Sequence, residues 1–116
     1  MGIGAAAHSF DGIKRYWIIS NNSVHDTNNI AIGAIGFEGV APNPAFDQAR
    51  DGMISGNTVY NITSFGNPAY GNEYAADGIY VDGGTRILIE RNLVHHVDIG
   101  IEVASEHAGR TSSDVI

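Results

Sequence analysis

Short apolar runs separated by turn residues dominate the pattern of hydrophobic and polar positions, and residues 78–98 display that pattern most clearly. This stretch holds three such runs, at residues 79–81, 87–89 and 93–97. Runs rich in Ile and Val, divided by Gly-Gly and Arg-Asn pairs, are typical of β-strands joined by tight turns. The opening Gly-Ile-x-Val pattern returns at Gly100, which is 100 − 78 = 22 residues after Gly78. That separation is too short for a strand-helix-strand unit and long enough for three strands and three turns, so it predicts one coil of a parallel β-helix.

A repeated asparagine supports the same architecture. Asn22, Asn57 and Asn92 are spaced by 57 − 22 = 35 and 92 − 57 = 35 residues. Their neighbours recur at the same interval, first as Val24, Val59 and Val94 and then as His25, Tyr60 and His95. Self-similarity at a fixed period indicates a stacked repeat protein. We therefore expect the asparagines to form one buried, hydrogen-bonded column and the His, Tyr and His positions to stack along an outer face.

The repeats divide residues 1–116 into about four coils of a single β-helix domain, which makes the predicted fold class all-β. The coils open at Gly2, Ala31, Gly78 and Gly100. Long loop insertions interrupt them at residues 35–50 and 63–76. Helix should be a minor component, because no long stretch has helical periodicity.

The end of the sequence falls inside a predicted strand. Residues 114–116 correspond to residues 86–88 of the third coil, and no corner asparagine follows them. On this pattern the domain is expected to be truncated at its C-terminus. Because an open coil end exposes apolar side chains and unpaired backbone groups, we expect a homo-oligomer that associates through open coil ends.

Composition narrows the choice of partners. The chain has 15 Gly, no Cys and a formal net charge of −7. Such an acidic chain lacks the basic footprint that nucleic acid requires, and it leaves neutral sugars, cations and basic partners open. Without Cys there is no disulfide scaffold or thiolate metal site. No stretch is long and apolar enough to span a membrane, so we expect neither a nucleic-acid nor a membrane partner.

With its Gly-Ile-x-Val strands and corner asparagines, the chain resembles the right-handed parallel β-helix proteins of the pectate-lyase-like superfamily. The resemblance implies a right-handed coil, a secreted or extracellular parent protein and a polysaccharide partner. It does not select a reaction, because that superfamily includes polysaccharide lyases, glycosidases, epimerases, tailspikes and binding modules. A lyase of this group typically places a lysine or arginine base beside calcium-binding carboxylates, and no motif gives that role to Lys14, the only lysine.

Alternation within the Gly-Ile-x-Val strands predicts which side chains face outward. Successive residues of a strand point to opposite faces, so Ile and Val should fill the interior. The inward positions are Ile32, Ile79, Val81, Ile101 and Val103. The outward column is then Gly4, Gly33, Tyr80 and Glu102. Since adjacent coils lie about 4.8 Å apart, Tyr80 and Glu102 should be neighbours, with the two glycines as an open floor where a sugar ring stacks on the tyrosine.

The two insertions flank this strand column, and loops that wall a rigid scaffold commonly carry function. The predicted substrate-binding residues are Tyr80, Gly33, Glu38, Tyr74, Glu106 and His107. Glu102 and Asp82 are the predicted catalytic acid and base, because glycosidases use two carboxylates about 5 Å or about 6.5–9.5 Å apart. The alternative is that these carboxylates are solvated surface acids and the insertions are tolerated surface loops.

No cofactor or metal site follows from a defined motif. His95 and His96 are adjacent in a strand, so they should point to opposite faces and not share one ion. Calcium on Glu73, Asp77 and Asp82 is an alternative, since hard cations favour clustered oxygens, but the spacing matches no known calcium loop.

Three functional hypotheses stay open at this point. The first is an enzyme, either a lyase or a glycoside hydrolase, that cleaves a polysaccharide over the outward column. The second is a noncatalytic carbohydrate-binding module that uses the same groove. The third is a structural stacking segment without a ligand, and fold alone does not choose among them.

Overall fold

The protein is built from parallel β-strands. The structure is a computed structural model that describes residues 1–6, 15–36, 43 and 47–116. In these ranges the chain forms eleven strands and no α-helix, so no described helix could cross a membrane. Every strand pairing is parallel. The expected insertion at residues 35–50, which contains Glu38, lies mostly outside the described residues.

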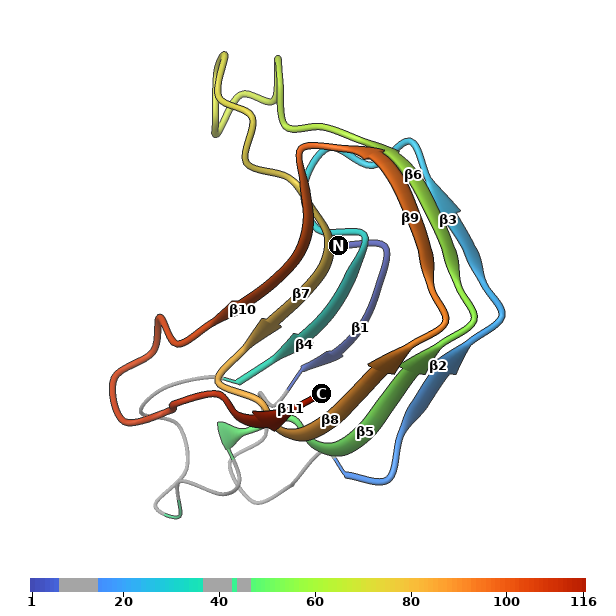
Figure 1. Ribbon diagram of the computed structural model, residues 1–116. Helices are drawn as coiled ribbons and strands as arrows, with labels where there is room; N and C mark the ends of the chain where they lie inside the picture. The colour runs from blue at the N-terminus through green and yellow to red at the C-terminus, as the bar shows by residue number, and fades with distance from the viewer. Residues whose placement is uncertain (7–14, 37–42, 44–46) are drawn as a thin grey trace.

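The strands form three sheets, which make three sides of the molecule around a common interior (Figure 1). The first sheet has the order β1 (Ile3–Ala6), β4 (Ile32–Ile35), β7 (Asp77–Asp82) and β10 (Ile99–Ala104). The second has the order β11 (Ser113–Val115), β8 (Thr85–Glu90), β5 (Arg50–Ser55) and β2 (Ile18–Ser20). The third consists of β3 (Ser23–His25), β6 (Thr58–Ile62) and β9 (Leu93–Val97).

The chain visits the three sheets in a fixed rotation. Strands β1, β2 and β3 lie one in each sheet, and β4, β5, β6 and then β7, β8, β9 repeat that order before β10 and β11 begin it again. Each strand therefore pairs with the strand one turn earlier or later, as in a β-helix-like solenoid. The predicted all-β, parallel architecture is confirmed. Its predicted register is confirmed too, because Gly4 pairs with Gly33, Gly33 with Tyr80, and Tyr80 with Glu102.

The asparagine column forms as expected. The backbone N–H and side-chain amide of Asn22 both donate to Asn57 Oδ1 at 3.0 Å, and those of Asn57 donate to Asn92 Oδ1 at 3.0 and 2.9 Å. Asn57 is 1% exposed, whereas Asn22 and Asn92 are half-buried. The expectation that all three are buried is thus correct only for the middle member, which has a ladder neighbour on both sides. Each link also satisfies a backbone N–H at the corner of the coil.

An aromatic column lies outside the third sheet. The rings of His25 and Tyr60 stack with centroids 4.8 Å apart, and those of Tyr60 and His95 stack at 5.4 Å. The predicted outer stack is therefore confirmed. The prediction for the adjacent pair is wrong, because the Nδ1 atoms of His95 and His96 lie 2.7 Å apart. His96 has a φ of 52°, and this left-handed conformation breaks the alternation on which the prediction relied.

Left-handed residues recur at equivalent positions of successive coils. They form three columns, namely Tyr16, Asp51, Arg86 and Asp114, then Asn21, Gly56 and Arg91, then Asp26, Asn61 and His96. Most L-residues avoid this conformation, so its repetition at equivalent positions indicates that stacking of the coils imposes it.

Aliphatic side chains from all three sheets fill the interior. Ile32, Ile79 and Val81 are fully buried, as alternation predicts. Ile101 and Val103 are 51% and 50% exposed, because β10 is the outermost strand of its sheet. Trp17 contacts both clusters of the core and needs a glycine beside it, since a Cβ at Gly52 would lie 2.1 Å from the indole ring.

Candidate functional site

The candidate site is a cavity of about 380 Å³ over the outer face of β7 and β10. We call it the β7–β10 groove and define it by the polar side chains Asp77, Tyr80, Asp82, Glu102, Glu106 and His107. All six residues come from β7, from β10 or from the loop that follows β10. Strand alternation predicted Tyr80 and Glu102, and the placement of Asp82, Glu106 and His107 near the strand ends predicted the other three that the sequence analysis named. The parallel register brings Tyr80 beside Glu102. Residues far apart in sequence thus meet in one groove.

Asp77 and Glu102 form the most perturbed pair in the groove. Asp77 begins β7, is 5% exposed, and lines the groove together with Glu102. Burial, the neighbouring carboxyl group of Glu102 and the nearby charges of Glu106 and Asp98 raise the pKa of Asp77 to about 7. A second carboxylate beside a buried carboxyl group disfavours ionisation, so the neutral form of Asp77 is stabilised. Near neutral pH the pair can therefore either donate or accept a proton.

Asp82 has a different environment at the other end of β7. Its carboxylate is 2% exposed, accepts a hydrogen bond from the backbone N–H of Glu106 at 2.8 Å, and lies 3.0 Å from His107 Nε2. These contacts tie the loop after β10 to the strand. Asp82 therefore positions Glu106 and His107 in the groove, a role that differs from that of a free acid or base.

The floor of the groove is less open than alternation suggested. A Cβ at Gly33 would lie 2.5 Å from Met1 Sδ, so the Met1 side chain already covers the two glycines of the column. Tyr80 lines the groove but is only 8% exposed. Burial, with the charge of Asp82 and contact with Glu106, raises the pKa of Tyr80 well above its usual range. The expectation of an open glycine floor is wrong, and little of the Tyr80 ring faces solvent.

Two other predicted binding residues lie apart from this groove or outside the described chain. Tyr74 is 66% exposed and stacks on Phe65, with ring centroids 5.2 Å apart. It is not among the residues that line the groove. Glu38 falls in residues 37–42, which the structure does not describe.

The calcium alternative gains no support from the described side chains. Asp77 and Asp82 both line the groove, but Glu73 does not. Within residues 1–6, 15–36, 43 and 47–116, no three His, Asp or Glu side chains converge as a metal site would require.

Residues 63–76 contribute to the groove and also to a second cavity. Ser64 Oγ donates to the carbonyl oxygen of Glu73 at 2.6 Å and so closes this loop on itself. The Asn67 side chain donates to the carbonyl oxygen of Asn28 at 2.8 Å, which ties the loop to the preceding coil. Figure 1 shows the loop projecting from the stacked strands.

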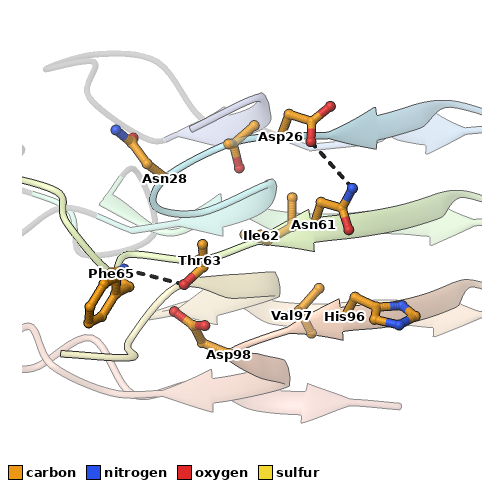
Figure 2. A pocket seen from close by; sticks show the side chains of 10 residues that line it. Asp26, Asn28, Asn61, Ile62, Thr63, Phe65, His96, Val97 and Asp98 are labelled. Carbon is orange, nitrogen blue, oxygen red and sulfur yellow. Dashed lines mark hydrogen bonds between the residues drawn. The ribbon is translucent and has the colours of Figure 1, made fainter. Parts of the chain in front are cut away.

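The second cavity, of about 520 Å³, lies where β3, β6 and β9 end, and we call it the corner cavity. Figure 2 shows Asp26, Asn61 and His96 on successive strands, with Phe65 at the opposite end of the cavity. These three residues form one of the left-handed columns. Asn61 donates to Asp26 Oδ1 at 3.4 Å.

The acids of the corner cavity are well supplied with hydrogen-bond donors. A hydrogen bond to His25 lowers the pKa of Asp26, with His25 Nδ1 2.6 Å from its Oδ2. Burial alone would raise the pKa of Asp98, but hydrogen bonds from Ser64, Ala76 and Thr63 lower it. The backbone N–H groups of Ser64 and Ala76 lie 2.8 and 3.1 Å from Asp98 Oδ2. Asp26 and Asp98 are therefore stabilised as carboxylates.

Strand alternation did not predict that Asp77 lies beside Glu102. Asp77 has the parity of Ile79 and Val81, so alternation assigns it to the interior and away from Glu102. Asp77 is the first residue of β7, and it lines the groove with Glu102 despite this parity. The sequence offers one weak signal for this placement, namely an acidic residue directly before a Gly-Ile-x-Val pattern.

Comparison with known proteins gives a relative without an assigned activity. The chain is similar to the uncharacterized protein YwoF of Bacillus subtilis (strain 168), with 48% identity over 97 residues. The alignment covers 84% of the chain and 20% of YwoF, so the chain spans about one fifth of that relative's length. No family model matches the chain. No solved structure matches it either.

Proposed function

We propose that the protein is a right-handed parallel β-helix of the pectate-lyase-like kind that binds and cleaves an extracellular polysaccharide in the β7–β10 groove. The observation that carries this proposal is the Asp77–Glu102 pair. A carboxyl group with a pKa near the working pH, placed in a groove beside a second carboxyl, is suited to general acid–base catalysis. The extracellular location is part of the proposal and comes from the resemblance of the repeats.

The pair acts as one unit in this proposal. Its carboxyl groups interact directly, so they lie closer together than the about 5 Å or about 6.5–9.5 Å between the two carboxylates of glycosidases. Asp77 and Glu102 therefore do not divide the roles of acid and nucleophile between them. The second carboxylate is assigned to Glu106, because Asp82 is engaged with His107 and the backbone of Glu106.

The same close contact favours a second candidate function. A groove whose carboxyl groups do not have the separation of a two-carboxylate glycosidase suits a noncatalytic carbohydrate-binding module. The two functions differ in one observable, because an enzyme releases shortened products while a binding module only retains the polymer.

A screen of polysaccharides for both retention and product release separates the two functions. For a polymer that is cleaved, Glu102→Gln should lower product release by about 10²–10⁴-fold, a larger loss than any change in retention. Asp26→Asn is the matched control, because Asp26 is an exposed acid of the corner cavity. Retention without release supports the binding module, and neither retention nor release of any polymer contradicts both functions.

A further inference from the structure

The charge of the β7–β10 groove restricts the ligand that it can hold. Asp77, Asp82, Glu102 and Glu106 contribute four carboxyl groups, and His107 is the basic side chain among the described residues that line it. No Lys or Arg is present in that lining. The summed field of several like charges in a cleft attracts cations and repels anions. A polyanionic glycan would therefore meet repulsion here, and a cationic one would be attracted.

Asp77 adds a second, independent indication of a missing partner. Its side chain is buried to 95%, since 5% is exposed, and its Oδ1 receives no hydrogen bond from a described donor. The neighbouring Glu102 carboxylate does not supply a donor, because an ionised carboxylate only accepts hydrogen bonds. Buried acceptors without a donor are uncommon in folded proteins. An N–H donor with a positive charge would satisfy Asp77 and allow both carboxyl groups to ionise.

We propose that the groove takes a glycan that carries free amino groups, with one ammonium group seated beside Asp77 and Glu102. This proposal rests on the proposed function, which supplies the polysaccharide, and it adds the class of sugar, a hexosamine without N-acetyl groups. N-acetylation changes the sugar nitrogen that would face Asp77 and Glu102, because it replaces three charged N–H donors by a single neutral one. Selection should therefore depend on the amine and not on the sugar backbone.

Glucosamine oligomers and the N-acetylated oligomers of equal length form a matched pair of probes. We expect the amino oligomer to bind this chain about tenfold more tightly at about pH 6, measured by titration calorimetry. That preference should shrink as salt rises from about 0.01 M to about 0.15 M, since the Debye length falls from about 30 Å to about 8 Å. Polygalacturonate of similar length, which carries the opposite charge, should bind most weakly.

Two variants locate the effect, and two outcomes overturn the proposal. Glu102→Gln and Asp77→Asn should each remove most of the tenfold preference, whereas Asp26→Asn should keep it; thermal unfolding checks that all three fold.

Equal or tighter binding of the N-acetylated oligomer overturns the amino-sugar proposal and leaves polysaccharide binding intact. Equally tight binding of a lysine oligomer overturns it as well, because acid attraction alone would then explain binding. If no neutral, acidic or amino glycan binds, the proposed function itself fails.

Discussion

The two cavities that share residues 63–76 shift the pKa values of their acids in opposite directions. In the corner cavity, backbone and hydroxyl donors surround Asp98, and its pKa is lowered even though it is partly buried. In the β7–β10 groove, Asp77 faces Glu102 and its pKa rises to about 7. The corner cavity is the larger, about 520 Å³ against about 380 Å³. The hydrogen-bond partners and neighbouring charges of a carboxyl group therefore matter more than the size of its cavity. They distinguish a carboxylate that stabilises the fold from one that is suited to proton transfer.

The largest expected effect is on catalysis in the groove. Asp77→Asn should lower product release by about 10²–10⁴-fold on any glycan that the protein cleaves, because the proton that Asp77 carries is lost. Product release by the unchanged protein should fall as pH rises through about 7, where Asp77 loses its proton. A pH–rate profile measures both effects. An unchanged profile in the variant would show that Asp77 does not supply the proton.

The next effect is on stability and belongs to the corner cavity. Asp98→Asn should lower the free energy of unfolding by about 1–2 kcal/mol, because a neutral amide oxygen accepts the hydrogen bonds from Ser64 and Ala76 more weakly than the carboxylate oxygen Oδ2 does. Glu102→Gln is the opposite case and should leave stability unchanged or raise it, since it removes a like charge beside Asp77. Urea unfolding of both variants tests the contrast. Equal losses in the two variants would contradict it.

The two acids should also give opposite pH dependences of stability. The pKa of Asp77 is raised on folding, so its contribution is fully present below the unfolded value of about 4 and is lost as pH rises to about 7. Relative to Asp77→Asn, the protein should thus lose stability across that window. The pKa of Asp98 is lowered, so its contribution is present above about pH 4 and is lost as pH falls through the folded value. Unfolding midpoints measured from about pH 3 to pH 8 would reveal both trends.

The smallest effect concerns the exposed side chains of the corner cavity. Asp26→Asn and Phe65→Ala should each change the free energy of unfolding by less than about 0.5 kcal/mol, because both side chains are solvent-exposed. Neither should alter glycan retention in the groove. Loss of retention in Phe65→Ala would move the binding site toward the Phe65–Tyr74 pair and away from β7 and β10.

The sequence by itself determined the strand order, the register and the asparagine and aromatic columns. These features follow from fixed spacing, because coils that stack in parallel place equivalent residues side by side, as in the pairing of Tyr80 with Glu102. The same spacing predicted Glu102 beside Tyr80, and the position of the insertions and strand ends predicted Asp82, Glu106 and His107, which also line the groove. Whether those residues bind or cleave a glycan, and whether coil ends associate, stay predictions.

Only the tertiary structure decided which of the outward positions are open and which acids interact. Met1 covers Gly33, and Asp77 lines the groove with Glu102, although a strand period predicts neither arrangement. His95 and His96 meet because the left-handed conformation of His96 breaks the alternation of β9. Periodicity fixes side-chain direction within a strand, but at corners the direction depends on backbone angles that stacking of the coils imposes.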